Sequence, residues 1–117
     1  MLSKEKLRKK FIKLRKRKYF DSKFKFFRPL INLIIKRKVK RISLYYPSNY
    51  EFSTVKLFKT LKKQNKIKTL LPVIETNKSI KFVNWKFSDP LLVNKFGFLE
   101  PLANTKKIIP DLILVPI

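Results

Sequence analysis

Cysteine and histidine are both absent from the 117 residues of this chain, and glycine occurs once, at Gly97. Without those two residue types the chain has no disulfide, no thiolate nucleophile, no imidazole base and none of the usual zinc ligand sets. A single glycine also excludes a P-loop and a G-x-G-x-x-G turn. Any chemistry must use Lys, Arg, Asp, Glu, Tyr or a bound cofactor, and the residues alone identify no catalytic side chain and no metal ligand.

Negative charge is scarce as well: the chain has 7 acidic residues and 30 Lys and Arg, which gives a formal net charge of +23. Hydrophobic residues at 44% and aromatic residues at 14% are too many for a disordered polycation, so we expect one folded domain. The chain has 24 Lys, 12 Ile and 11 Phe, residues with A/T-rich codons. Codon bias is therefore our main interpretation of the charge, and binding to a polyanion is the alternative.

Long hydrophobic runs are also missing. The longest, LINLII and LILVPI, fall far short of the ~20 residues that a membrane span requires, and no apolar segment follows the basic N-terminus as it would in a signal peptide. We therefore predict a cytoplasmic protein without a membrane partner.

The first third of the chain is different in kind, because residues 1–41 hold 18 of the 30 basic residues. Within a basic helical segment, 1–38, we expect a helix that begins near Ser3, with an apolar stripe at helical spacing. A second helix should run from Pro29 to the cluster at 36–38. The stripe consists of Leu7, Phe11 and Leu14.

Residues 39–117 read as a βαβ arrangement. A helix from about Ser53, with Val55, Phe58 and Leu61 on its buried face, lies between two apolar runs. This pattern predicts an α/β fold with a mostly parallel sheet and the N-terminal helical segment packed on it. In such sheets ligands bind at the carboxyl ends of the strands. The expected strands are 41–46, 67–74 and 111–115, the last a buried run, with 80–87 at an edge or in a hairpin.

The chain also carries, in order, KEKLR, KRISLYYP, EFST, LLPVI, IKFVNW, NKFGFLEP and PDLILVPI. This series resembles the 5-formyltetrahydrofolate cyclo-ligase family, also called methenyltetrahydrofolate synthetase, over nearly the whole chain. The resemblance implies a three-layer fold and the ATP-driven closure of 5-formyltetrahydrofolate to 5,10-methenyltetrahydrofolate, with Mg²⁺ on the nucleotide. The family's Gly-rich ATP loop and later magnesium position are absent from these residues. We therefore expect an N-terminal portion that cannot turn over at a useful rate, as a fragment, a remnant or one part of a split gene with a separate C-terminal segment.

By the same resemblance, Lys4 and Arg8 match the family's N-terminal K-x-x-x-R, which contacts ATP. They are one helical turn apart and share a face, so they could grip a polyphosphate together. The alternative is that both are ordinary cations of a solvated helix.

For folate, the resemblance points to Tyr46 and to Glu51, which matches the acidic residue of E-x-x-T. Phe96 could stack on a pterin because Gly97 permits close approach, whereas Trp85 is better explained by strand packing. The alternatives are that Tyr46 is a core-edge aromatic and that Glu51 lies in the first turn of a helix. Glu100 has no assigned role.

A second function stays open: a basic RNA-binding or ribosome-associated domain, whose N-terminal helix would track phosphates.

Overall fold

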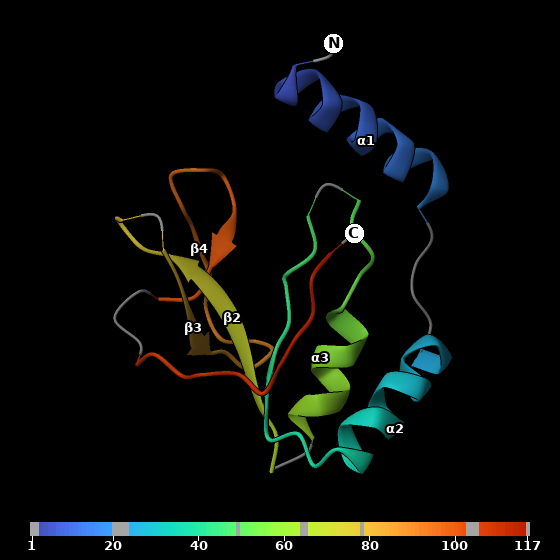
Figure 1. Cartoon of the computed structure of the whole chain (residues 1–117), viewed down its shortest axis with the longest axis vertical. Helices are drawn as coiled ribbons and strands as arrows, with labels where there is room; N and C mark the ends of the chain where they lie inside the picture. Colours follow the sequence, from blue (N-terminus) through green and yellow to red (C-terminus); the bar gives the residue numbers. More distant parts are fainter. Residues whose placement is uncertain are drawn as a thin grey trace.

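The computed structural model describes residues 3–19, 24–48, 50–63, 66–77, 79–102 and 106–116. A four-stranded sheet of order β3-β2-β1-β6 forms the body, α2 and α3 lie beside it, and α1 stands apart above it (Figure 1). The α/β class is confirmed. The helices are α1 (Lys4–Lys18), η1, a 3-10 turn (Phe24–Phe27), α2 (Arg28–Lys36) and α3 (Val55–Lys62), and the strands are β1 (Arg41–Ser43), β2 (Lys68–Ile74), β3 (Ile80–Asn84), β4 (Leu92–Val93), β5 (Leu99–Glu100) and β6 (Leu112–Ile113).

The sheet is mostly parallel, as predicted. Strand β1 pairs in parallel with β2 on one side and with β6 on the other, and β3 pairs antiparallel with β2 at the edge of the sheet. Strand β1 ends earlier than the expected Tyr46, at Ser43. The reason lies two residues further on, because the carbonyl of Tyr45 accepts a hydrogen bond from the Thr54 hydroxyl at 2.6 Å instead of one from a neighbouring strand.

The core lies between the sheet and the two helices α2 and α3. Helix α3 buries Phe58 and Leu61, as its spacing predicted, but its third buried residue is Leu57, while Val55 is only half-buried. Pro29 stands in the first turn of α2, as expected, and Ile34 is buried. The sheet and the layer formed by α2 and α3 are two layers, and the third layer of the family's fold stays an expectation. The core cluster comprises Phe27, Ile34, Ile42, Leu44, Leu57, Phe58, Leu61, Leu71 and Trp85.

Helix α1 forms where it was predicted, and the hydroxyl of its N-cap Ser3 accepts from the Lys6 amide at 3.2 Å. Within the N-terminal helical segment, α2 packs on the body as expected, but α1 does not: none of its residues is buried, and Leu7 and Phe11 are 38% and 51% exposed. Ten of its 15 residues are Lys or Arg, so the apolar stripe is too narrow to hold it down. The radius of gyration, 15.3 Å, accordingly exceeds the ~13 Å of a compact chain of this length.

The run at 111–115 enters the sheet as β6, but the expectation that it is buried is wrong. Ile113 and Val115 are exposed, because an edge strand with one covered face buries only alternate side chains, here the half-buried Leu112 and Leu114. No helix in the described ranges is both long and apolar enough to cross a membrane.

Candidate functional site

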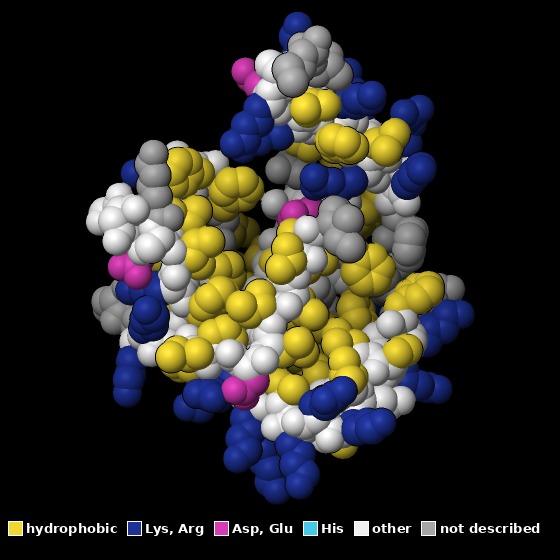
Figure 2. Space-filling model, viewed as in Figure 1, with side chains coloured by type: hydrophobic (Ala, Val, Ile, Leu, Met, Phe, Trp, Pro, Cys, Tyr) yellow, Lys and Arg dark blue, Asp and Glu magenta, His cyan; other side chains and the backbone are white. Residues whose placement is uncertain are grey.

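A cleft of about 740 Å³ separates α1 from the carboxyl end of the sheet. Figure 2 shows the hollow below α1, with basic side chains along the helix and hydrophobic ones on the body opposite. Its position is the one where ligands were expected from the sequence, at the carboxyl ends of the parallel strands. The lining residues are Arg8, Ile12 and Arg15 from α1, Ser48 and Glu51 from the loop after β1, Ile74 from the end of β2, and Phe96 and Phe98.

The upper wall of the cleft is one face of α1. Arg8, Ile12 and Arg15 follow each other at spacings of four and three residues, so their side chains project from the same side of the helix. Lys4 stands one turn before Arg8 but does not line the cleft. The structure therefore brings Arg8 to the site and adds Arg15, a residue that the sequence analysis missed.

The opposite wall carries a carboxylate. Glu51 Oε1 accepts from the amide and the hydroxyl of Ser48, at 2.9 and 3.2 Å, and these bonds close a tight turn. Within the described residues Oε2 receives no hydrogen bond, and Glu51 lines both the cleft and the cavity beside it. Glu51 is not in the first turn of a helix, because α3 begins only at Val55. Burial, and then the charge of Glu51, raise the pKa of the neighbouring Tyr45 phenol.

A smaller cavity of about 220 Å³ adjoins the cleft and shares Ser48, Glu51, Ile74 and Phe98 with it. Tyr46 lines this cavity and also meets Trp85 edge to face, with ring centroids 6.0 Å apart. Trp85 itself is 2% exposed and lines neither cavity, in agreement with a packing role. Tyr46 is therefore both a core-edge aromatic and a cavity wall.

The β4–β5 hairpin, which the sequence analysis did not predict, presents the two phenylalanines. Asn94 Oδ1 accepts from the amides of Phe96 and Phe98 at 2.9 and 3.0 Å, and Gly97 takes the positive φ, 83°, that closes the turn. The two rings are 50% and 46% exposed. The N-x-F-G-F pattern was the signal that could have located this turn. Asn94 Nδ2, a buried donor without a partner among the described residues, belongs to a side chain that lines the smaller cavity.

Glu100 now has a structural role. Its Oε2 accepts from the Ile74 amide at 2.7 Å and so fastens the hairpin to the end of β2. No spacing in the sequence links residues 26 positions apart, which explains why this contact was not found. Among the described residues, no group of three or more acidic side chains could hold a metal ion.

Together these features define an α/β protein with an open cleft at the carboxyl end of its parallel strands, cationic on one wall and acidic and aromatic on the other. The family model described as "5-formyltetrahydrofolate cyclo-ligase family" matches residues 1–117. The chain belongs to this family.

Two relatives support the assignment. A curated 5-formyltetrahydrofolate cyclo-ligase from Haemophilus influenzae (strain ATCC 51907 / DSM 11121 / KW20 / Rd) is 33% identical over 93 residues, covering 74% of this chain and 49% of the relative. The NMR structure of 5,10-methenyltetrahydrofolate synthetase from Aquifex aeolicus superimposes with a TM-score of 0.61 at 26% identity, over 97% of this chain and 60% of that one. The chain thus spans about half the length of the curated relative.

Proposed function

We propose that this chain carries the substrate-binding cleft for ATP-dependent closure of 5-formyltetrahydrofolate to 5,10-methenyltetrahydrofolate. In the proposed reaction the formyl oxygen attacks the γ-phosphorus of ATP and ADP leaves. N10 then attacks the activated formyl carbon and loses its proton, and the original formyl oxygen departs with the phosphate. Phosphoryl transfer depends mainly on positioning and charge neutralisation, so a chain without His or Cys can contribute to it.

The observation that supports this proposal is the polarity of the cleft. Two guanidinium groups, Arg8 and Arg15, stand on α1, and Glu51 stands on the opposite wall. Guanidinium forks suit phosphate oxygens, whereas a carboxylate suits the amino and ring N–H groups of a pterin. We assign the ATP phosphates to the first wall and the folate to the second, with Phe96 and Tyr46 as the aromatic contacts of the pterin.

The proposal assigns no metal site. Mg²⁺ would offset negative charge on the nucleotide, and among the described residues no group of three or more acidic side chains could hold it without the nucleotide. We also do not assign a phosphate-binding role to Lys4, because it lies outside the cleft lining.

The test is to titrate the chain separately with ATP and with 5-formyltetrahydrofolate by calorimetry. We expect Glu51→Gln to weaken folate binding by roughly tenfold and to leave ATP binding unchanged, because the neutral amide lacks the second acceptor oxygen. Glu75→Gln is the matched control, since Glu75 lines neither cavity. Mixing both substrates with Mg²⁺ and following methenyltetrahydrofolate by absorbance should show no useful turnover.

Failure of the chain to bind either ligand would contradict the proposal, as would equal weakening by Glu51→Gln and Glu75→Gln. Turnover comparable to that of a full-length family member would instead show that the Gly-rich loop is dispensable.

The second candidate, RNA binding, is favoured by one observation: ten basic side chains on a helix with no buried residue. Tight, strongly salt-dependent RNA binding by a chain that ignores both small ligands would select it.

A further inference from the structure

A second cavity, of about 670 Å³, lies at the opposite end of the sheet. Its walls come from the C-terminal end of α2, the start of β1 and the start of β6, whereas the cleft described above lies beyond the ends of β1 and β2. The cavity is bounded by four cationic side chains, Arg37, Lys38, Lys40 and Arg41, and includes the partly exposed Leu33. We call it the basal cavity.

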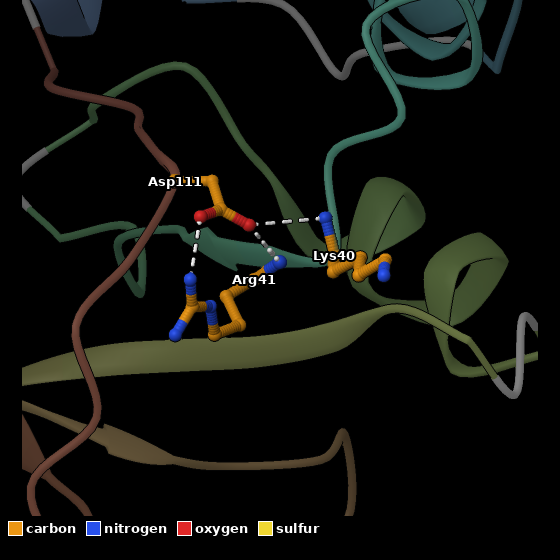
Figure 3. Close-up of polar contacts among 3 residues, drawn as sticks. All are labelled: Lys40, Arg41 and Asp111. Atoms are coloured by element: carbon orange, nitrogen blue, oxygen red, sulfur yellow. Dashed lines mark hydrogen bonds and ion pairs between the residues drawn. The ribbon is translucent and has the colours of Figure 1, made fainter.

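One carboxylate, Asp111, also lines the basal cavity, but its charge is already engaged. Its Oδ1 accepts from the Arg41 guanidinium at 2.8 Å, and its Oδ2 accepts from the amides of Arg41 and Lys40 at 3.0 and 3.2 Å. Figure 3 shows the Lys40 side chain turned away from the carboxylate. Arg37, Lys38 and Lys40 have no ion pair within the described residues, so the lining carries three uncompensated positive charges.

Stabilisation of α2 does not account for this cluster. Cations in or just after the last turn of a helix offset its dipole, which explains Lys36 and Arg37. In the last turn of α2, the carbonyls of Leu33, Ile34 and Ile35 already accept from the backbone amides of residues 37–39. Lys40 and Arg41 lie beyond the helix, at the sheet.

The distribution of arginine separates this site from the lysine-rich surface. The 30 basic residues include 24 Lys, which leaves six Arg, and two of them line the cleft and two the basal cavity. Codon bias toward A and T explains abundant lysine on any exposed surface, but it does not place four of six arginines at two concave sites. Arginine matches phosphate oxygens through its planar fork.

We propose that the basal cavity binds a multivalent phosphate-bearing anion, held by Arg37, Lys38 and Lys40 and independent of the substrate cleft. Arg41 acts as a positioning residue, because its pairing with Asp111 joins the start of β1 to the start of β6. Two sources have the required chemistry, a free nucleoside polyphosphate and the backbone of a single-stranded RNA.

The experiment is a titration of the ¹⁵N-labelled chain with inorganic triphosphate at about 0.15 M salt, followed by residue-resolved NMR. We expect saturable shifts at the amides of residues 37–41. Arg37→Gln with Lys40→Gln should weaken binding at these amides by roughly tenfold or more. The matched control, Lys9→Gln with Lys10→Gln, removes the same charge from α1 and should leave them unchanged.

Lys38→Gly separates binding from stability. Lys38 has a φ of 53°, which glycine adopts without strain, so this substitution should raise the melting temperature while it weakens triphosphate binding. Unchanged binding would overturn the proposal, and so would equal weakening in the α1 control or the absence of shifts at residues 37–41. Repeating the titration with ATP and with oligouridylates of increasing length distinguishes the sources, because only RNA should gain affinity with length.

Discussion

Helices α1 and α3 form for different reasons. Helix α1 has strong local signals: the Ser3 cap, Glu5 in its first turn and four basic residues in its last, yet it buries none of its 15 residues. Helix α3 has no side-chain hydrogen bond at its N-cap Thr54 and only eight residues, but it buries three of them. Local signals decided where α1 forms, while tertiary packing secures α3. The two helices therefore have different roles: α3 packs against the sheet and stabilises the core, whereas α1 places the cationic side chains of Arg8 and Arg15 in the wall of the cleft.

The largest effect should come from α3. Phe58 is fully buried and meets Trp85 edge to face, with centroids 4.9 Å apart. We expect Phe58→Ala to lower the free energy of unfolding by about 3–5 kcal/mol, measured by urea denaturation, because the truncation leaves a core cavity. Phe11→Ala on α1 is the matched control, and its 51% exposure predicts a change within about 0.5 kcal/mol. Similar losses from both variants would break the comparison.

The next effect should come from α1 and should appear in binding only. Arg8→Gln with Arg15→Gln should weaken ATP binding by roughly 10- to 100-fold, since each removes a charge-assisted phosphate contact. Both positions lie on a helix without buried residues, so the melting temperature should change little.

Lys4→Gln with Lys6→Gln removes the same charge from α1 outside the cleft lining and should weaken ATP binding by less than about threefold, from loss of exposed charge alone. Calorimetry on both variants would show whether position or net charge decides the affinity, and equal losses would favour net charge.

The sequence predicted the features that depend on local signals and missed those that depend on tertiary packing. Periodicity and caps located α1, α2, α3 and the three parallel strands within a few residues. They could not show that α1 stays off the body, because Leu7 and Phe11 have the spacing of a buried face whether or not a partner surface exists. Strand 111–115 was apolar enough to be interior, but its place at the sheet edge depends on pairing across about 70 residues.

The residues of the candidate site could likewise be predicted from the sequence only in part. Arg8, Glu51 and Phe96 line the cleft and Tyr46 lines the cavity beside it, whereas Lys4 lines neither. Arg15 could have been found by extending the Arg8 face by two turns. The pairing of Glu100 with Ile74 could not, because it arises from the hairpin's docking on β2.

A smaller effect should come from the hairpin that faces α1 across the cleft. Gly97 has a φ of 83° and open space around it, so Gly97→Ala costs only backbone strain, about 1 kcal/mol. Folate binding should weaken with it, because the turn aims Phe96 at the cleft, while ATP binding should be unaffected. Asn94→Ala, which removes the acceptor for two turn amides, should reproduce the pattern. Unaltered folate affinity in both variants would show that Phe96 does not contact the folate.

The smallest effect should be a pH dependence of the stability of the sheet, caused by Asp111. Hydrogen bonds from Arg41 and Lys40 hold the pKa of Asp111 below its ordinary value. A carboxylate with a depressed folded-state pKa stabilises the fold above its unfolded pKa, near 3.9, and the contribution is lost as pH falls through the folded value. In urea denaturation, wild type should therefore exceed Asp111→Asn in stability near pH 6, and the difference should shrink below about pH 4. Comparing the two proteins cancels the other acidic groups. The hydrogen bonds of Asp111 with Arg41 and Lys40 involve no residue of α1, so the helical signal of α1 should not follow this difference in stability. A difference in stability that stays constant across the whole pH range would show that Asp111 acts through its shape and not through its charge.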